Sequence, residues 1–490
     1  MEHRSAFLSF TACLLLSCAA PAPAPIDTTI TPDPAIARID SFMQRSMRNG
    51  FNGSLLVMRD GKAVIDKGYG LRDREKQLPN TPATVHAIGS ITKQFTAACV
   101  MKLQEMGKLN VHDPMSKYVS GVPKDKAAIT LHQLLTHSAG FPDAIGDDYA
   151  PIGRENFLEL AMSTPLKFAP GSGYNYSNVG YSILGAIVEM VSGQSYERFL
   201  HDQLLKPAGV EHTGYLIPDW SHADLAIGYE KDSERWGTML DHPWADDGPY
   251  WHLRCNGGIL STTHDMADWV EALHTHKVLD SATVASMFMP YVQEGEGAGS
   301  HYGYGWAIFN TPRGTRLITH NGGNGIQFAD VLWYADEGVT IVLMSNASLR
   351  GMQDMAWEVG HMIFDPHYEP RMVQPAKSLA GLPAGAAGDR LKSLLAIISS
   401  GGDDAALKSW LQKNLGPGFL KDQPMERHLS AFKQAHKDIG AHHIERIEQL
   451  GPEEYALHLR SDHDKSLFRV MVQLRPSDAL IGGLGVEKEE

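Results

Sequence analysis

Residues 89–96 read GSITKQFT, and this stretch places a serine and a lysine three positions apart, Ser90 and Lys93. The aliphatic pattern predicts a helix over residues 90–106, with both side chains on one face, about one turn apart. A serine hydroxyl is a poor nucleophile until a neighbouring base takes its proton, and a lysine can do so only when it is neutral. The spacing therefore indicates Ser90 as a nucleophile and Lys93 as its general base.

The Ser-x-x-Lys spacing alone is weak evidence, because about one such string is expected by chance in a chain of this length. Ser430 and Lys433 repeat the same spacing near the C-terminus. The interpretation of Ser90 and Lys93 as catalytic residues therefore depends on further elements of the chain.

A second element, Tyr176-Ser177-Asn178, lies in PGSGYNYSNVGY, just before a helix predicted over residues 179–205. A tyrosine hydroxyl held near cationic groups can pass protons between Ser90 and a leaving group. The Asn178 amide can bond both Lys93 and a substrate carbonyl. For a single tyrosine in a loop, packing of the ring is the commoner role.

A third element, HNGG at residues 320–323, closes a predicted strand that begins with RLIT. Small residues at a strand edge let a substrate lie alongside, so His320, Gly322 and Gly323 are predicted to bind substrate. The backbone N–H of Gly323 is the predicted oxyanion donor beside that of Ser90. His-x-Gly also occurs at residues 212–214, but there it lies in a predicted helical region with no pair of strands after it.

Four segments together resemble the class C β-lactamase-like serine hydrolases. They are GSITKQFT at 89–96, LLTHSAG at 134–140, YSN with GYSILG at 176–185, and HNGG at 320–323. This group includes low-molecular-weight penicillin-binding proteins, D-amino-acid peptidases and esterases. The resemblance covers residues 35–365, and the joint pattern is specific where each piece is not.

The resemblance implies a role for each matching residue. By position these are Ser90 as nucleophile, Lys93 as base, Tyr176 as second acid/base, Asn178 as orienting residue and His320 at the strand position. It also implies the α/β (α+β) fold of these proteins, an antiparallel sheet flanked by helices with an all-helical subdomain and the site between them. One departure matters: the third motif is usually Lys-Thr-Gly and here is His-Asn-Gly. Because a histidine is mostly neutral at pH 7, we expect a weaker grip on substrate carboxylates, which favours esterase or D-peptidase action over efficient β-lactamase action.

Predicted strands lie at both ends of this region. GSLLVMRDGKAVIDKGYGLRD, from residue 53, is typical of two strands joined by an Asp60-Gly61 turn. RLITH, FADVLWYA and GVTIVLMSNA are typical of three more strands. Helices are predicted at residues 36–48 and 352–364, with mainly helices and loops between about 110 and 300. Because a lone hairpin is only marginally stable in water, we expect one sheet of a mixed α/β domain, assembled from both ends.

The C-terminal part changes character after a predicted linker at residues 371–382. Its predicted helices are 388–400, 404–414 and 425–439, followed by strands at 442–449, 454–461, 466–475 and 479–486. Three helices and then an antiparallel sheet predict a separate accessory α+β domain at residues 383–490. Its outline is similar to the nuclear-transport-factor-2-like (NTF2-like) folds. The hydrolase domain is expected to span residues 35–370.

The first residues are typical of a targeting segment. Arg4 precedes the apolar run 6–16 and then small residues, which predicts a signal peptide at 1–18 followed by a Pro/Ala-rich tether at 19–34. Leu15-Leu16-Ser17-Cys18 resembles a lipoprotein box, with Cys18 as the lipid-bearing residue and possible membrane attachment, although Ala-x-Ala-type cleavage nearby competes. We expect an exported bacterial protein, either periplasmic or a membrane-anchored lipoprotein.

Composition narrows the class of partner. The net charge of -14 disfavours nucleic acid, and the 23 histidines show no metal-ligand spacing, so neither a metal nor a cofactor is expected. The expected partner is a small-molecule or peptide substrate, and the oligomeric state stays open. Cys99 and Cys255 allow a disulfide, but buried free thiols are favoured.

Two other functional interpretations of the sequence compete with a β-lactamase-like hydrolase. Thr136 to Gly140 (THSAG) is similar to the Gly-x-Ser-x-Gly elbow of α/β-hydrolases, but that elbow needs a preceding strand, and ITLHQLL predicts the start of a helix. The other is a non-catalytic protein of the same fold that binds or senses penicillin or peptidoglycan fragments. Loss of Ser90 or Lys93 would indicate it, and both residues are present.

Overall fold

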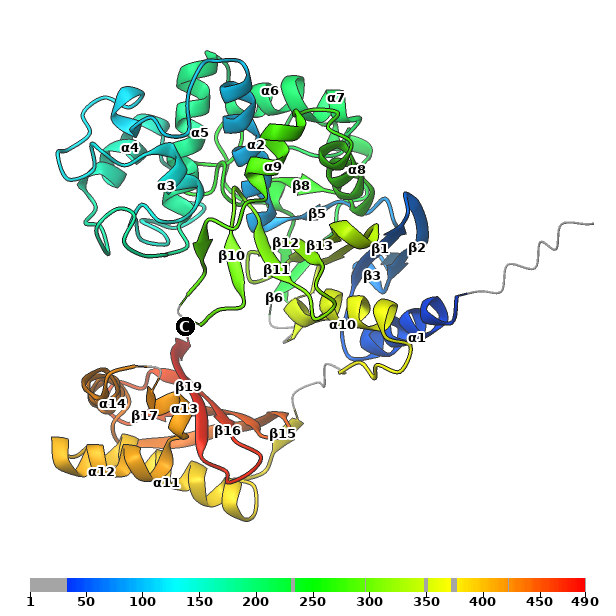
Figure 1. The fold of residues 1–490 in the computed structure, drawn as a ribbon. Coiled ribbons are helices and arrows are strands. Elements are labelled where there is room, and N and C mark those ends of the chain that lie inside the picture. Colours follow the sequence, from blue (N-terminus) through cyan, green and yellow to red (C-terminus); the bar gives the residue numbers. More distant parts are fainter. Residues whose placement is uncertain are drawn as a thin grey trace, which may run out of the picture.

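A computed structural model describes most of the chain and divides it into a larger and a smaller body (Figure 1). The described residues are 33–230, 234–295, 297–347, 351–371, 377–421 and 423–489. The predicted signal peptide, the Cys18 lipid site and nearly all of the predicted tether lie outside these ranges. Within them, every helix is too short or too polar to cross a bilayer.

The larger body is organised around an eight-stranded antiparallel sheet in the order β2-β1-β14-β13-β12-β11-β10-β9. Its strands are β1 Gly53–Arg59, β2 Lys62–Tyr69, β9 Val292–Gln293, β10 Ser300–Tyr302, β11 Ala307–Asn310, β12 Arg316–Gly323, β13 Phe328–Tyr334 and β14 Val339–Ser345. The first hairpin pairs with the last strand, with Leu55 opposite Leu343. This confirms that one sheet is assembled from both ends of the segment.

Three two-stranded sheets lie between the larger elements of this body, among the described residues. They are β3 Leu71–Asp73 with β4 Leu78–Pro79, β5 His86–Ala87 with β8 Leu260–Ser261, and β6 Gly228–Glu230 with β7 Glu234–Gly237.

Both faces of the large sheet are buried against apolar clusters. Successive side chains of a strand point to opposite sides, so one strand contributes to both clusters. In β14, Ile341 and Leu343 join one apolar cluster, whereas Val342 and Met344 join the other. Helices α1 Pro34–Arg48 and α10 Met352–Phe364 contribute to the first cluster. The helical region packs on the second face (Figure 1).

The helical region places the segment that begins at Ser90 between other helices and the sheet. It comprises α2 Thr92–Glu105, α3 Leu131–Leu135, α4 Arg154–Ser163, α5 Asn178–Ser192, α6 Tyr196–Leu200, α7 Lys206–Ala208, α8 Thr263–His274 and α9 Ser281–Met287. The single helix expected over residues 179–205 is wrong. It ends where Gly193 adopts a left-handed conformation with φ of 72°, a common helix C-cap, and the chain restarts as α6 and a π-helical turn, His201–Leu205.

From residue 386 on, the smaller body follows the predicted order of helices and then strands, with four helices among the described residues where three were predicted. It contains α11 Ala386–Ser400, α12 Asp404–Asn414, α13 Pro417–Lys421, α14 Met425–Asp438, β15 Lys377–Leu379, β16 His442–Gly451, β17 Glu454–Ser461, β18 Leu467–Leu474 and β19 Ile481–Glu489. Its five-stranded sheet has the order β15-β16-β17-β18-β19, and its apolar core comes from its own helices and strands. The resemblance to NTF2-like folds stays a prediction.

One boundary differs from the prediction. The expected linker at 371–382 contains β15, which pairs with β16 so that Leu379 lies opposite Ile447. Pairing with a neighbouring strand supplies the backbone hydrogen bonds that a short polar segment cannot make alone. No local pattern in residues 371–382 predicts this strand.

In the larger body, Cys99 and Cys255 are buried free thiols, as predicted.

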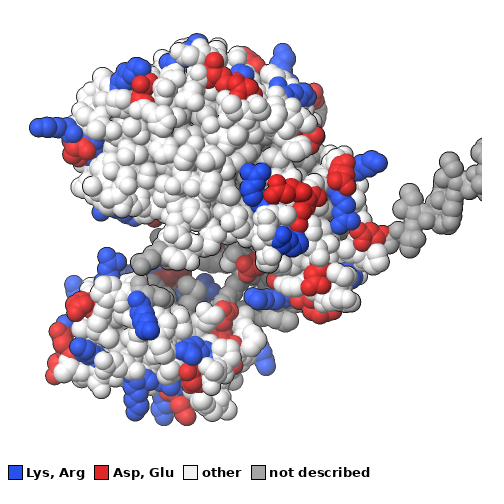
Figure 2. Space-filling view, viewed as in Figure 1, with Lys and Arg blue, Asp and Glu red and all other residues white. Residues whose placement is uncertain are grey.

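The surface in Figure 2 carries acidic and basic side chains intermixed, and a broad area of the larger body has few charged side chains on this face. A face of this kind lacks the continuous basic stripe by which proteins track a phosphate backbone. The expectation about nucleic acid stays a prediction.

Candidate active site

Ser90 lies in a tight turn at the start of a buried helix. The 3-10 turn Gly89–Ile91 leads directly into α2. Together they span residues 89–105, which confirms the predicted helix over 90–106 to within one residue at each end. Gly89 has a φ of +50°, and a Cβ there would lie 2.4 Å from the amide nitrogen of Gly323. The turn therefore requires a glycine at residue 89. This glycine lets the backbone at Ser90 lie in contact with the end of β12.

Lys93 lies one turn further along and is positioned as a base. Its Nζ is 3.0 Å from Ser90 Oγ and donates a hydrogen bond of 2.8 Å to the main-chain carbonyl of Asn256. The side chain is completely buried, and burial lowers its pKa well below the ordinary lysine value, although the Asp148 carboxylate opposes that shift. A neutral amine with a free lone pair beside a hydroxyl is what proton removal from Ser90 needs.

Tyr176 reaches the same point from the loop before α5. Ser177 caps α5 by accepting a hydrogen bond from Gly180 N, which fixes the preceding loop. Lys93 Nζ lies 4.7 Å from the centre of the Tyr176 ring. Burial raises the pKa of Tyr176, and the influence of the Ser90 hydroxyl offsets only part of that rise. The phenol is therefore protonated at neutral pH.

His320 lies on β12 and is buried between neighbouring rings. Its Nε2 is 2.8 Å from the hydroxyl of Tyr302, and its Nδ1 is 2.6 Å from the carbonyl oxygen of Asn321. Burial, followed by the influence of Lys93, lowers the pKa of His320 to about 3. The imidazole is therefore neutral at physiological pH, as expected from the sequence.

Gly322 and Gly323 let β12 approach the Ser90 turn at backbone distance. A Cβ on Gly322 would lie 2.1 Å from Ile88 O and 2.4 Å from Ser90 N. Only residues without side chains fit this contact, and the amides of Ser90 and Gly323 consequently lie close together. These two amides are the predicted oxyanion donors, and that role stays a prediction.

Asn178 is placed differently from the expectation. It is the first residue of α5, and its backbone N–H donates to the carbonyl of Asp143 at 2.9 Å. Its side-chain oxygen is buried and has no hydrogen-bond partner among the described residues. The predicted bond to Lys93 is not among its contacts, and Lys93 donates to the Asn256 carbonyl.

Three contributors to the site were missed from the sequence. The first is the Asn256 carbonyl, which has no sequence signature because every residue carries one. The second is Tyr302, in the stretch HYGYGW, for which no catalytic or binding role was predicted. The third is His137, which accepts a hydrogen bond of 3.0 Å from Ser177 N and lies 4.4 Å, ring to ring, from Tyr176. Its LLTHSAG segment carries part of the family resemblance, but no role was predicted for His137 itself.

The competing motifs lie elsewhere. Lys433 forms an ion pair with Asp404 in the smaller body, so the Ser430/Lys433 string belongs to a packed pair of helices. The residues before Thr136 form helix α3, with no strand leading into them, so the α/β-hydrolase elbow is absent there.

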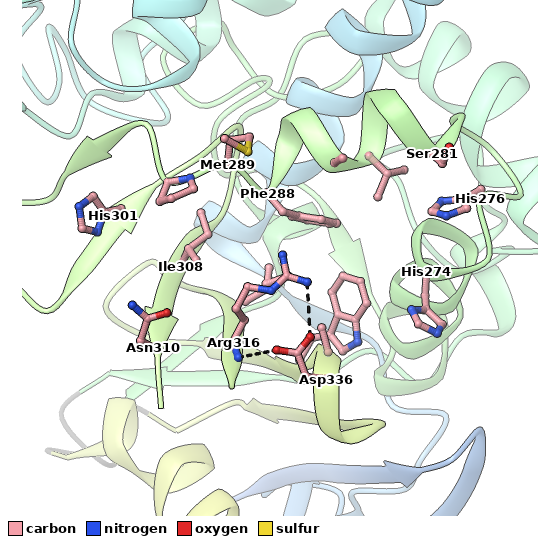
Figure 3. A pocket seen from close by; sticks show the side chains of 16 residues that line it. His274, His276, Ser281, Phe288, Met289, His301, Ile308, Asn310, Arg316 and Asp336 are labelled. Atoms are coloured by element: carbon pink, nitrogen blue, oxygen red, sulfur yellow. Dashed lines mark hydrogen bonds and ion pairs between the residues drawn. The ribbon is translucent and has the colours of Figure 1, made fainter. Parts of the chain in front are cut away.

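A separate pocket of about 620 Å³ lies between α9 and strands β11 and β12 (Figure 3). Phe288 and Ile308 are among the residues that line it, and two further lining residues, Arg316 and Asp336, form an ion pair. None of the three motifs lines it, so it is distinct from the Ser90 site. No group of acidic, histidine or cysteine side chains suited to hold a metal was found in the described ranges.

The site combines a serine at the start of a helix, a lysine one helical turn on and a partly buried tyrosine, set against the end of an antiparallel strand. This combination defines a serine hydrolase of the β-lactamase and penicillin-binding-protein type. The beta-lactamase family model matches residues 37–360. Because this match covers most of the chain, the chain belongs to the beta-lactamase family.

A curated relative and two solved structures of the same fold are similar to this chain. Protein flp of Staphylococcus aureus strain MW2 is 27% identical over 335 residues, 63% of this chain and 62% of that protein. The octameric penicillin-binding protein homologue from Pyrococcus abyssi has a TM-score of 0.63 at 23% identity, covering 93% of this chain and 98% of that one. EstCE1, a hydrolase with promiscuous acyltransferase activity, has a TM-score of 0.60 at 20% identity, covering 69% of this chain and all of that one. The match thus spans less than two thirds of the length of Protein flp.

Proposed function

We propose that the protein hydrolyses uncharged esters or amides through an acyl-enzyme on Ser90. The observation that carries this proposal is the distance of 3.0 Å between Ser90 Oγ and the Nζ of a buried Lys93. Because burial lowers the pKa of Lys93, the amine can accept the Ser90 proton as the hydroxyl attacks a carbonyl carbon.

The remaining steps follow from the neighbours of Ser90. The backbone amides of Ser90 and Gly323 stabilise the oxyanion. Tyr176, which burial keeps protonated, donates its proton to the leaving group and regains one from Lys93, whose Nζ lies 4.7 Å from its ring. Water then attacks the acyl-enzyme with the same residues in reversed roles, which releases the acid and restores Ser90.

Substrate preference follows from the neutral His320. Penicillins and peptides ending in D-alanine carry a carboxylate, which a permanent cation at this strand position would bind. The pKa of His320, about 3, leaves the site without that cation. We therefore propose that short-chain esters are better substrates than cephalosporins.

The test is a panel of p-nitrophenyl esters, nitrocefin and D-Ala dipeptides, assayed on the purified protein together with labelling by a fluorescent fluorophosphonate. We expect ester turnover and stoichiometric labelling that Ser90→Ala removes. His320→Lys should shift the preference toward carboxylate-bearing substrates. Efficient nitrocefin hydrolysis with esters untouched would contradict the substrate proposal, and absence of any labelling would favour a binding protein that has lost turnover.

We also propose that this reaction takes place outside the cytoplasm, on the basis of the leader-like residues 1–18. Expression in a bacterial host with a radiolabelled fatty acid would test whether Cys18 carries a lipid. Loss of the label in Cys18→Ser is the expected result. Equal labelling of both proteins would exclude Cys18 as the lipid site.

A further inference from the structure

The hydrogen bonds around His320 define the position of its proton. Its Nδ1 lies 2.6 Å from the carbonyl oxygen of Asn321, and a carbonyl oxygen only accepts, so Nδ1 carries the hydrogen. A neutral imidazole has one N–H, so Nε2 carries a lone pair. The Tyr302 hydroxyl, 2.8 Å away, is then the donor to Nε2.

Tyr302 comes from a different part of the sheet. It ends β10, which is separated from β12 by β11. Its side chain is 1% exposed and His320 is 6% exposed, so water does not compete freely for this bond. The rings that face this pair include Tyr176, 6.2 Å from His320 by ring centres, and His137 and Tyr174, 4.5 Å and 6.2 Å from Tyr302.

Both nitrogens of His320 are therefore occupied by the protein itself. The ring has neither a positive charge nor a free N–H to offer to a substrate. Lys93, the neutral base of the site, already bonds the Asn256 carbonyl and serves Ser90. A substrate carboxylate arriving at the end of β12 would be desolvated without a partner, which is costly.

We propose that Tyr302 is a specificity-determining positioning residue. Its hydroxyl holds His320 in the Nδ1–H tautomer with Nε2 occupied, and this selects acyl donors that have no carboxylate next to the scissile bond. The inference rests on the proposed hydrolase function and extends it to the residue that enforces the preference. Tyr302 acts through His320 and needs no contact with the substrate.

Removal of the hydroxyl should release this constraint. In Tyr302→Phe, Nε2 loses its donor, while Nδ1 keeps its bond to Asn321 O. An arriving carboxylate can then stabilise a proton on Nε2 through a charge-assisted hydrogen bond. A bond of that kind corresponds to about a tenfold change in affinity.

The experiment compares two matched substrates, phenyl butanoate and its 3-carboxyphenyl analogue, on the full chain. The quantity measured is the ratio of their kcat/KM values, so a general loss of activity cancels. Tyr302→Phe should raise the ratio in favour of the carboxylate about tenfold, mainly through KM. In a His320→Ala background the same substitution should leave the ratio unchanged, because Tyr302 acts only through that ring.

Tyr304→Phe is the matched control. Tyr304 is also a buried tyrosine, two residues away, and its hydroxyl lies 2.8 Å from the Nδ1 of another histidine, His132. Its loss should leave the ratio unchanged. An unchanged or lower ratio in Tyr302→Phe, or an equal rise in Tyr304→Phe, would overturn the proposal.

A spectroscopic measurement separates this inference from the proposed function. The ¹⁵N spectrum of histidine-labelled protein, assigned with His320→Ala, should show a neutral His320 protonated on Nδ1. A wild-type His320 protonated on Nε2 would overturn the inference even if Ser90 turns over esters. If Ser90 is not labelled by a fluorophosphonate, the hydrolase proposal fails, and the tautomer result still stands or falls on its own.

Discussion

Gly322→Ala should remove most of the activity, because a methyl group there collides with the backbone that carries Ser90. The added Cβ would lie 2.1 Å from Ile88 O and 2.4 Å from Ser90 N, and real Cβ contacts are almost never below 3.0 Å. Strand β12 and the turn must therefore separate by about 1 Å. Both colliding atoms belong to the backbone, so no change of rotamer can relieve the contact.

A separation of this size moves the proposed oxyanion donors away from the Ser90 hydroxyl. Misplacement of about 1 Å at a reacting centre lowers a rate about 10²-fold. We expect kcat/KM for a short-chain p-nitrophenyl ester to fall by about that factor, and the rate of fluorophosphonate labelling to fall with it. Overpacking should also lower the free energy of unfolding by about 1–3 kcal/mol, measured by denaturant melts followed by circular dichroism.

Two other glycines provide controls. Gly299→Ala meets no atom within 4 Å and should behave as wild type. A Cβ on Gly323 meets its nearest atom, Gln327 O, at 3.1 Å, and the substitution keeps the backbone N–H, so its loss should be much smaller than that of Gly322→Ala. The reasoning is refuted if Gly322→Ala keeps more than about one third of wild-type kcat/KM.

Ser90→Ala should abolish turnover and covalent labelling, whereas Ser430→Ala should leave both unchanged; labelling followed by peptide mass spectrometry checks this, and label on another residue would contradict it. Activity should be lost as the pH falls through the lowered pKa of Lys93, because the amine is neutral only above that pKa. In a plot of kcat/KM against pH, the decline on the acid side should therefore lie below the ordinary lysine pKa of about 10.4. Tyr176→Phe should slow turnover about 10²- to 10⁴-fold with binding retained, and a near-normal rate would assign the second proton transfer to another residue. A chain truncated near residue 370 should keep labelling and ester turnover, whereas a folded but inactive product would show that the smaller body helps to build the site.

Local signals predicted much of the fold. Asp60 and Gly61 both have positive φ, so the chain closes the β1–β2 hairpin where the Asp-Gly pair indicated. Helix α10 has the predicted bounds, residues 352–364. The break after Ser192 was missed, because the aliphatic pattern continues past Gly193 and outweighed its effect.

The sequence by itself determined which side chains could carry the chemistry, because Ser90 and Lys93 are joined by helical spacing and spacing is a local property. The tertiary structure alone decided their protonation states. The pKa values of Lys93 and His320 fall because other segments bury them, and burial is a property of the assembled core. The partners that orient these residues, Asn256 O and the Tyr302 hydroxyl, come from positions 163 residues beyond Lys93 and 18 residues before His320. No sequence period links such positions, since only the packing of the helices against the sheet brings them together.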